Sequence, residues 1–330
     1  MISLLVEQLD KLKHSSGLFR ASPKLSSTGY NRIWIRDNLY ISLGYEAMGE
    51  IYTVKQIYWS LLDILLKHEY KIDYAIKKKP KEDFQYIHPI YTEELEEIKG
   101  TWGWKQNDSI GGLLFHIGRL ENEYQIIRNK NDKRILQKLV YYLRSIEYWK
   151  DDDNGMWEEN KEIHASSVGA CVAGLKSISP IVKVDYSLIK KGEERLNKLL
   201  PNESITKNTD LSLLSLIYPY NVVSKEMSNT ILNNIEKQLL RKKGIIRYVG
   251  DGYYNRNNIE ASWTMGLPWE SIIYQLIKNP GKRKYYIDKS LDACAVNNTL
   301  PELYIEDKYP NENNPLGWSQ SLMIVALLLH

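Results

Sequence analysis

The chain has 330 residues, of which 43% are hydrophobic and 26% are charged, a composition typical of a folded globular protein rather than a disordered one. Its 44 basic and 41 acidic residues are well mixed, so the formal net charge of +3 argues against a nucleic-acid-binding protein. The longest apolar run, Leu322–Leu329, is far shorter than the ~20 residues of a membrane-spanning helix.

The N-terminal segment and the metal-binding residue types indicate where the protein works and what it needs. Residues 1–13 lack a basic start followed by an apolar run, so we expect no secretory signal and a cytoplasmic protein. Cys171 and Cys294 show no ligand spacing, and we expect two free thiols. The six histidines are not paired, which disfavours a metalloenzyme. We therefore expect neither a metal nor a cofactor.

Helical periodicity recurs along almost the whole chain, with apolar residues three or four positions apart. The predicted helices, in chain order, cover residues 2–13, 37–49, 51–68, 108–121, 132–149, 164–177, 185–200, 209–218, 224–242, 260–277, 281–294 and 316–329. Pro268 lies inside the tenth of these and must kink it or mark its true start.

These helices alternate between two kinds. The odd-numbered ones are amphipathic, as in 224–242, where Met227, Ile231 and Ile235 form one stripe. The even-numbered ones are apolar or small on nearly all sides, as in 168–174, and must be buried all round. The alternation predicts an all-α fold, a six-hairpin (α/α)6 toroid with an inner ring of six helices inside an outer ring of six. We expect one domain over residues 1–330.

In such a toroid, the loops that enter the inner helices open at one end and meet around one cavity. These loops, residues 14–36, 69–107, 150–163, 201–208, 243–259 and 295–315, are the longer connections, and long loops on a rigid scaffold often carry function. Most of the nine tryptophans lie in them or in the inner helices. An indole suits the apolar face of a sugar ring. The tryptophans of this group are Trp34, Trp102, Trp104, Trp157, Trp263, Trp269 and Trp318.

The same loops carry charged and amide side chains that could bind hydroxyl groups. Asp37 and Asp108 stand near the start of inner helices, so helix capping is an equally good explanation for them, and the two roles can coexist. The candidates of this kind are Arg36, Asp37, Gln106, Asp108, Glu158, Glu159, Arg247, Asp251 and Glu302.

Glu158 and Glu302 are the candidate catalytic pair. Glu158 follows Trp157 and precedes a buried helix, so burial and the neighbouring Glu159 should raise its pKa, as a general acid requires. Glu302 lies on the last loop, across the predicted cavity. Hydrolysis of an acetal needs two such carboxyl groups, ~6.5–9.5 Å apart for inversion of the anomeric carbon or ~5–5.5 Å apart for retention.

An ordered set of motifs resembles the glucoamylase family, glycoside hydrolase family fifteen. The motifs run over nearly the whole chain: Gly-Tyr30-Asn-Arg-Ile-Trp34-Ile-Arg36-Asp37, Trp102-Gly-Trp-Lys-Gln106-Asn-Asp108, Gly155-Met-Trp157-Glu158-Glu159, His164-Ala-Ser-Ser-Val-Gly169, Arg247-Tyr-Val-Gly-Asp251-Gly-Tyr-Tyr254, Leu300-Pro-Glu302 and Pro315-Leu-Gly-Trp318-Ser319.

The resemblance implies an inverting exo-acting α-glucosidase that hydrolyses terminal α-linked glucose from maltooligosaccharides. It implies Glu158 as the acid, Glu302 as the base, and Ser319 as a residue that orients Glu302. The groups that it implies around the terminal glucose are Arg36, Asp37, Trp102, Glu159 and Arg247. The β-sandwich domain and the starch-binding module of some relatives have no counterpart in this sequence, so we expect an oligosaccharide substrate rather than granular starch.

Two alternatives stay open. The stretches 34–40, 165–175, 211–219 and 244–253 also resemble the N-terminal region of the phosphorylase kinase α and β subunits, which implies a regulatory, non-catalytic module. A trehalase of the same family would share the chemistry and differ in substrate. The sequence does not determine the linkage preference or the oligomeric state.

Overall fold

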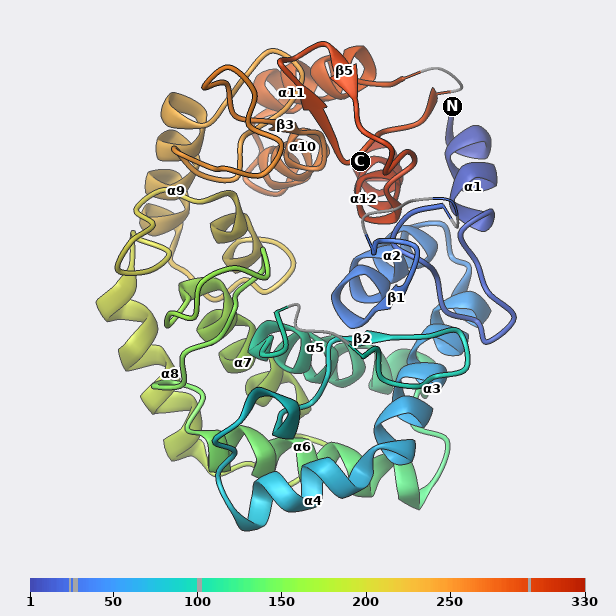
Figure 1. The fold of residues 1–330 in the computed structure, drawn as a ribbon, viewed down its shortest axis with the longest axis vertical. Coiled ribbons are helices and arrows are strands. Elements are labelled where there is room, and N and C mark those ends of the chain that lie inside the picture. Colours follow the sequence, from blue (N-terminus) through green and yellow to red (C-terminus); the bar gives the residue numbers. More distant parts are fainter. Residues whose placement is uncertain (24, 26–28, 100–102, 296–297, 330) are drawn as a thin grey trace.

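The structure is a computed structural model that describes residues 1–23, 25, 29–99, 103–295 and 298–329. Two concentric rings of helices form a toroid, and the chain runs once around it (Figure 1). The inner ring consists of α2 (Ile35–Ala47), α5 (Asn107–Tyr124), α7 (Ala165–Ile178), the 3₁₀ helix η2 (Leu211–Leu216), α10 (Gly266–Leu276) and α12 (Gly317–Leu328). The outer ring consists of α1 (Ile2–Asp10), α3 (Ile51–Lys67), α6 (Lys130–Ile146), α8 (Tyr186–Leu199), α9 (Lys225–Gln238) and α11 (Pro280–Asp292). The predicted all-α toroid is confirmed.

Small residues let the inner helices pack closely. A Cβ atom added to Gly111 on α5 would lie 2.4 Å from the backbone nitrogen of Cys171 on α7, and one added to Gly174 would lie 2.3 Å from the carbonyl oxygen of Gly111. The ring closes where α12 meets α2, because the Ser321 hydroxyl accepts a 2.9 Å hydrogen bond from the Gly44 amide. These contacts explain why the inner helices carry small residues where an isolated helix would not need them.

Two predicted segments differ from the structure. Over 209–218 the prediction of an α-helix was wrong, because the chain forms only the short 3₁₀ helix η2. The Asp210 side chain accepts from the Ser212 amide and the Ser215 hydroxyl donates to the Ser212 carbonyl, so side chains satisfy backbone groups that a longer helix would use. The loop predicted over 69–107 contains a further helix, α4 (Glu69–Lys77), which packs against α6.

The start of α10 also differs from the prediction. The predicted helix 260–277 begins at Gly266, since Pro268 belongs in a first turn and the preceding residues form a strand. That strand, β3 (Ser262–Trp263), pairs antiparallel with β4 (Leu303–Ile305), which pairs with β5 (Tyr309–Pro310). A second small sheet joins β1 (Ile33–Trp34) to β2 (Ile90–Tyr91). A one-turn 3₁₀ helix, η1 (Asp83–Gln85), precedes β2.

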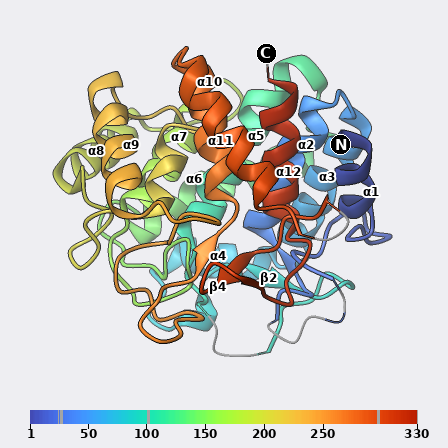
Figure 2. The same ribbon diagram turned by 90° about the horizontal axis from the view of Figure 1, so that it is seen from above.

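The long connections and the small sheets gather at one end of the toroid, away from the C-terminus (Figure 2). We call this the loop end. At the other end the connections are short, as between α2 and α3 or between α5 and α6. The loops that precede α2, α5, α7, η2, α10 and α12 therefore meet at the loop end, as the alternation of helices predicts. No helix within the described ranges is both long and apolar enough to cross a membrane.

Candidate active site

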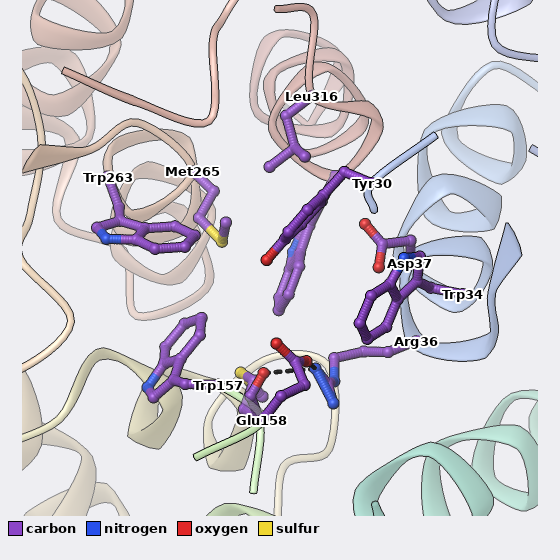
Figure 3. A pocket seen from close by; sticks show the side chains of 11 residues that line it. Tyr30, Trp34, Arg36, Asp37, Trp157, Glu158, Trp263, Met265 and Leu316 are labelled. Atoms are coloured by element: carbon purple, nitrogen blue, oxygen red, sulfur yellow. Dashed lines mark hydrogen bonds and ion pairs between the residues drawn. The ribbon is translucent and has the colours of Figure 1, made fainter. Parts of the chain in front are cut away.

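Eleven side chains from these loops and from the starts of the inner helices surround a narrow cavity (Figure 3). The cavity has a volume of about 10 Å³, roughly the space that one water molecule needs. The site is therefore closed in this structure. The lining residues are Tyr30, Trp34, Arg36, Asp37, Met156, Trp157, Glu158, Trp263, Met265, Leu316 and Trp318.

Glu158 ends a tight turn on the loop between α6 and α7, which we call the acid loop (residues 147–164). Its backbone is left-handed, with φ of 56°, and Gly103 of the preceding long loop packs directly against it. A Cβ atom at Gly103 would lie 2.6 Å from the Glu158 Cβ. The turn directs the Glu158 carboxyl into the cavity, where it meets Arg36 (Figure 3).

Arg36 holds three segments together at the loop end. Its Nε donates to Asp108 at 2.7 Å, and its Nη1 donates to Glu158 at 2.5 Å. The remaining donors go to the Gln106 side chain and to carbonyl oxygens of the acid loop, those of residues 155 and 156. All five N–H groups of the guanidinium are thus directed at protein acceptors. In this closed site the donors of Arg36 hold other residues in position. Gln106 and Asp108 accept hydrogen bonds from Arg36 and do not line the cavity.

The pKa of Glu158 reflects its burial. Burial raises it to about 8, the charges of Arg36 and Arg247 oppose the rise, and that of Asp37 adds to it. The carboxyl is therefore mostly protonated at neutral pH. Asp37, in the first turn of α2, is also buried, and burial together with Glu302 raises its pKa to about 7 against the charge of Arg36. A protonated carboxyl with a pKa near 8 is suited to donate a proton.

Glu302 lies directly before β4 and is completely buried. Its Oε2 accepts hydrogen bonds from the side-chain amides of Asn311 and Asn313, the latter at 2.8 Å, whereas Oε1 has no hydrogen bond from the described residues. Burial raises the pKa of Glu302, while the two asparagines, Arg247 and the Tyr30 hydroxyl lower it. Glu302 does not line the cavity itself, but the lining residues Tyr30 and Asp37 are close enough to interact electrostatically with it.

Ser319 was predicted to orient Glu302, and in the structure Thr264 links Ser319 to the backbone of Glu302. The Thr264 hydroxyl donates to the carbonyl oxygen of residue 301, and its oxygen lies in hydrogen-bonding contact with the Ser319 hydroxyl at 3.1 Å. The Thr264 amide donates to the Glu302 carbonyl oxygen at 3.0 Å. Ser319 therefore contacts the backbone that carries Glu302 through Thr264, and the carboxylate is held by the two asparagines instead.

Tyr30 connects the two carboxyl groups. The charges of Glu302 and Glu158 both raise its pKa, after burial, so both side chains lie near its hydroxyl. Tyr30 also stacks on Trp34, with ring centroids 5.6 Å apart. Tyr30 was not among the predicted site residues, although it belongs to the motif that contains Trp34 and Arg36, because a single tyrosine in a loop gives no signal by itself. Asn311 and Asn313 were missed for the same reason.

Glu159 points away from Glu158 into a network of cations. Arg247 donates to one oxygen at 2.7 Å, and Lys207 and the Tyr248 hydroxyl donate to the other at 2.6 and 2.7 Å. Although burial raises the pKa of Glu159, the charges of Arg247 and Lys207 lower it below its ordinary value. Arg247 also forms a two-pronged ion pair with the fully buried Asp251. Lys207 was not among the predicted residues.

Among the described residues, five aromatic rings line the cavity, and four of them are the indoles of Trp34, Trp157, Trp263 and Trp318. Trp157 packs against Trp263 and Trp318 at 5.5 and 6.3 Å, and its indole nitrogen donates to Asp210 at 2.8 Å. The Arg247 guanidinium lies 4.8 Å from the Trp263 ring. Trp269 packs behind this wall, and Trp104 contacts a histidine of the long loop instead. The predicted site residue Trp102 lies outside the described residues.

Comparisons of the sequence point to one family. A model of the family described as Glycosyl hydrolases family 15 matches residues 5–326. The chain is also similar to the probable phosphorylase b kinase regulatory subunit alpha of Caenorhabditis elegans, with 24% identity over 90% of this chain and 30% of that protein. The skeletal muscle alpha subunit of Oryctolagus cuniculus gives the same values. The chain thus spans about 30% of the length of these relatives.

The fold is similar to those of solved glycosidase and glucoamylase structures. A glycosidase solved in complex with glucose superposes with a TM-score of 0.83 at 15% identity, covering 100% of this chain and 98% of that one. The glucoamylase from Saccharomycopsis fibuligera gives a TM-score of 0.71 at 13% identity, covering 98% and 93%. At such identities the similarity establishes a shared fold.

Proposed function

Because the chain belongs to the glycosyl hydrolases family 15, we propose that it is an inverting exo-acting α-glucosidase, which hydrolyses terminal α-linked glucose from maltooligosaccharides and releases β-glucose. One observation carries the proposal: Glu158 and Glu302, from loops that lie far apart in the sequence, both interact with the same two cavity residues, Tyr30 and Asp37. Acetal hydrolysis needs two carboxyl groups at one site, and here Glu158 lines the cavity while Glu302 lies close to two of its lining residues.

The two carboxyl groups have environments that suit different roles. Glu158, with a pKa of about 8, is protonated at neutral pH and would donate its proton to the departing glycosidic oxygen. Glu302 has Oε2 fixed by Asn311 and Asn313, which leaves Oε1 to accept a proton from the attacking water. The water would attack the face of the anomeric carbon opposite to the leaving group, which inverts its configuration.

The remaining predicted residues would bind the terminal glucose and shape its subsite. Asp37 lines the cavity and has one buried oxygen, Oδ1, with no hydrogen-bond partner among the described residues, so it is available to a sugar hydroxyl. Trp34, Trp157 and Trp318 offer indole faces. Since the cavity holds about 10 Å³, a glucosyl ring binds only after lining side chains move apart. We propose an oligosaccharide substrate and no cofactor.

The direct test is to incubate the purified protein with maltose, maltotriose, isomaltose and trehalose, and to follow the anomer of the released glucose by NMR. We expect hydrolysis of the maltooligosaccharides with β-glucose appearing first. α-Glucose as the first product would exclude inversion. Cleavage of trehalose in preference to the other sugars would replace the proposed substrate by that of a trehalase and keep the roles of both carboxyl groups.

A second candidate function is a non-catalytic carbohydrate-binding regulatory module. Two observations favour it: the similarity to phosphorylase kinase regulatory subunits over 90% of the chain, and the 2.5 Å hydrogen bond by which Arg36 holds Glu158 inside a closed site. Calorimetry with glucose and maltotriose separates the two functions. Binding without any release of glucose would favour the regulatory module, whereas turnover would exclude it.

A further inference from the structure

The side chain of His164 packs against the turn that carries Glu158. His164 is the N-cap residue of α7, and its side chain is 3% exposed. Its ring fills the space under Gly155, because a Cβ atom added to that glycine would lie 2.8 Å from two ring atoms. Gly155 has a φ of 63°, and its carbonyl oxygen accepts hydrogen bonds from the Glu158 amide at 3.4 Å and from Arg36 at 3.5 Å. The ring therefore supports the same residue that fixes Glu158 and its partner.

Both ring nitrogens of His164 have partners on different segments. Nδ1 lies 3.4 Å from Glu203, on the loop between α8 and η2, and Nε2 lies 3.5 Å from the carbonyl oxygen of Asn160 on the acid loop. Glu203 is itself fixed, since it accepts from the amide and the hydroxyl of Ser166 at 3.1 and 2.5 Å. His164 thus connects the acid loop to a carboxylate that is anchored on α7.

The charges around His164 hold it as a cation. Burial alone would lower its pKa, but the hydrogen bond to Glu203 and the charge of Asp153 raise it to about 9, against the opposing charge of Lys207. Glu162 is the further carboxylate that interacts with the ring. A cationic imidazole donates from both nitrogens, which matches the two acceptors. At neutral pH the His164 ring therefore donates both to Glu203 and to the Asn160 carbonyl oxygen, and so links the loop of Glu203 to the acid loop.

The loop of Glu203 contacts the acid loop at two more places. Lys207 pairs with Glu159 at 2.6 Å, and Thr206 donates from its amide to Glu162 at 3.2 Å. The acid loop is thus held by two groups of residues. On one side it contacts Arg36, which lines the cavity, and Gly103, which packs against Glu158. On the other side it contacts residues 203–207, which do not line the cavity. On this second side, the described residue that packs directly against Gly155 is His164.

We propose that His164 is a positioning residue: its ring, held by Glu203 and packed under Gly155, sets the position from which Glu158 reaches the glycosidic oxygen. The inference rests on the proposed function, because it assigns His164 to the same reaction. Misplacing a catalytic group by about 1 Å can lower turnover by about 10²-fold, so a support under the turn is expected to act on kcat.

The test is a double-mutant cycle of Gly155→Ala and His164→Ala. Each single variant should lower kcat for maltotriose about 10- to 100-fold with KM within about twofold. In the double variant the added methyl group occupies the space of the missing ring, so kcat should be no lower than in the worse single variant. Gly49→Ala is the matched control: its φ is 75°, but no atom lies within 4 Å of an added Cβ. It should lower Tm slightly and leave kcat unchanged.

The outcomes separate this inference from the proposed function. Fold losses in kcat that multiply in the double variant, or a Gly155→Ala variant with wild-type kcat, would overturn it. If the wild type releases glucose from none of the sugars, the proposed function fails, and the cycle is read from Tm and from glucose affinity in calorimetry. Non-additive changes in both would support positioning of the site by His164, whereas additive Tm shifts or unchanged affinity would refute it.

Discussion

Among the described residues, two glutamates have no exposed surface at all, and their surroundings are opposite. Glu302, at the loop end, has one oxygen held by two asparagine amides. Glu270, on α10, has no hydrogen bond to either oxygen from the described residues, and it packs near Tyr274 and Tyr286. Burial raises both pKa values, and for Glu270 Glu236 raises it further. Burial without hydrogen-bond donors therefore leaves a carboxyl group with a raised pKa, and it is the asparagine donors that make Glu302 a candidate base.

The largest expected effect comes from removing that base. Glu302→Gln should lower kcat about 10⁴-fold, because the amide keeps the volume and cannot accept a proton from water. The loss should be as large with 4-nitrophenyl α-glucoside as with maltose, since the leaving group does not affect activation of the water. Steady-state kinetics with both substrates measures this, and near-normal turnover would remove Glu302 from the reaction.

Glu158→Gln should cause a smaller loss that depends on the leaving group. We expect about 10³-fold with maltose and much less with 4-nitrophenyl α-glucoside, because nitrophenolate leaves without a proton. In the wild type, kcat should fall as pH rises through about 8, where Glu158 loses its proton, and this alkaline limb should be absent in the variant. Equal losses on the two substrates would contradict the role of acid. A pH–rate profile completes the measurement.

The asparagines should have an intermediate effect. Asn311→Ala or Asn313→Ala removes a donor that lowers the pKa of Glu302, so this pKa should rise and the acidic limb of kcat/KM should move to higher pH. We expect kcat to fall about tenfold in each variant, about the effect of one hydrogen bond to a charged group. An unchanged acidic limb would show that the asparagines do not control the ionisation of Glu302.

The smallest effect, and one of opposite sign, is expected at Glu270. Its pKa is raised in the folded chain, so its contribution to stability is greatest below pH ~4.5 and is lost as pH rises toward the folded-state pKa. Glu270→Leu should therefore raise the free energy of unfolding by about 1–3 kcal/mol near neutral pH, and by less at pH 5. Urea unfolding at both pH values measures it, with Glu236→Gln as the control. A Glu270→Leu variant that is less stable than the wild type and has normal kcat would contradict this prediction and would mean that Glu270 has a stabilising partner.

The fold follows from the sequence more completely than the site does. Apolar residues on all sides of segments such as 168–174 can be satisfied only in an inner ring, so the pattern predicts the toroid. The short helix η2 could not be predicted, since backbone groups that a longer helix would use bond to the side chains of Asp210 and Ser215, residue types that a longer helix could also contain. Helix α4 was missed because its buried stripe is too short, with Ile72 and Ala75 as its main apolar members.

The site, like the fold, has features that the sequence predicts and features that it does not. Trp34, Trp157 and Trp318 could be predicted to share a cavity, because their loops must meet at one end of a closed ring. The contacts among charged residues could not, because they join segments whose relative height in the ring the sequence does not specify. Thus Arg36, which was predicted to bind sugar, directs its donors at the start of α5 and at the acid loop, and the asparagines that hold Glu302 were missed.

Closure of the ring has a consequence for how the protein is made. The hydrogen bond between Gly44 and Ser321 joins residues 277 positions apart, and α1 packs against α12. A ribosome releases the second helix long before the last one, so a growing chain must keep an incomplete ring with uncovered apolar inner helices. Contacts so distant in sequence form slowly, and such intermediates associate readily. The growing chain thus remains prone to association until α12 emerges and closes the ring.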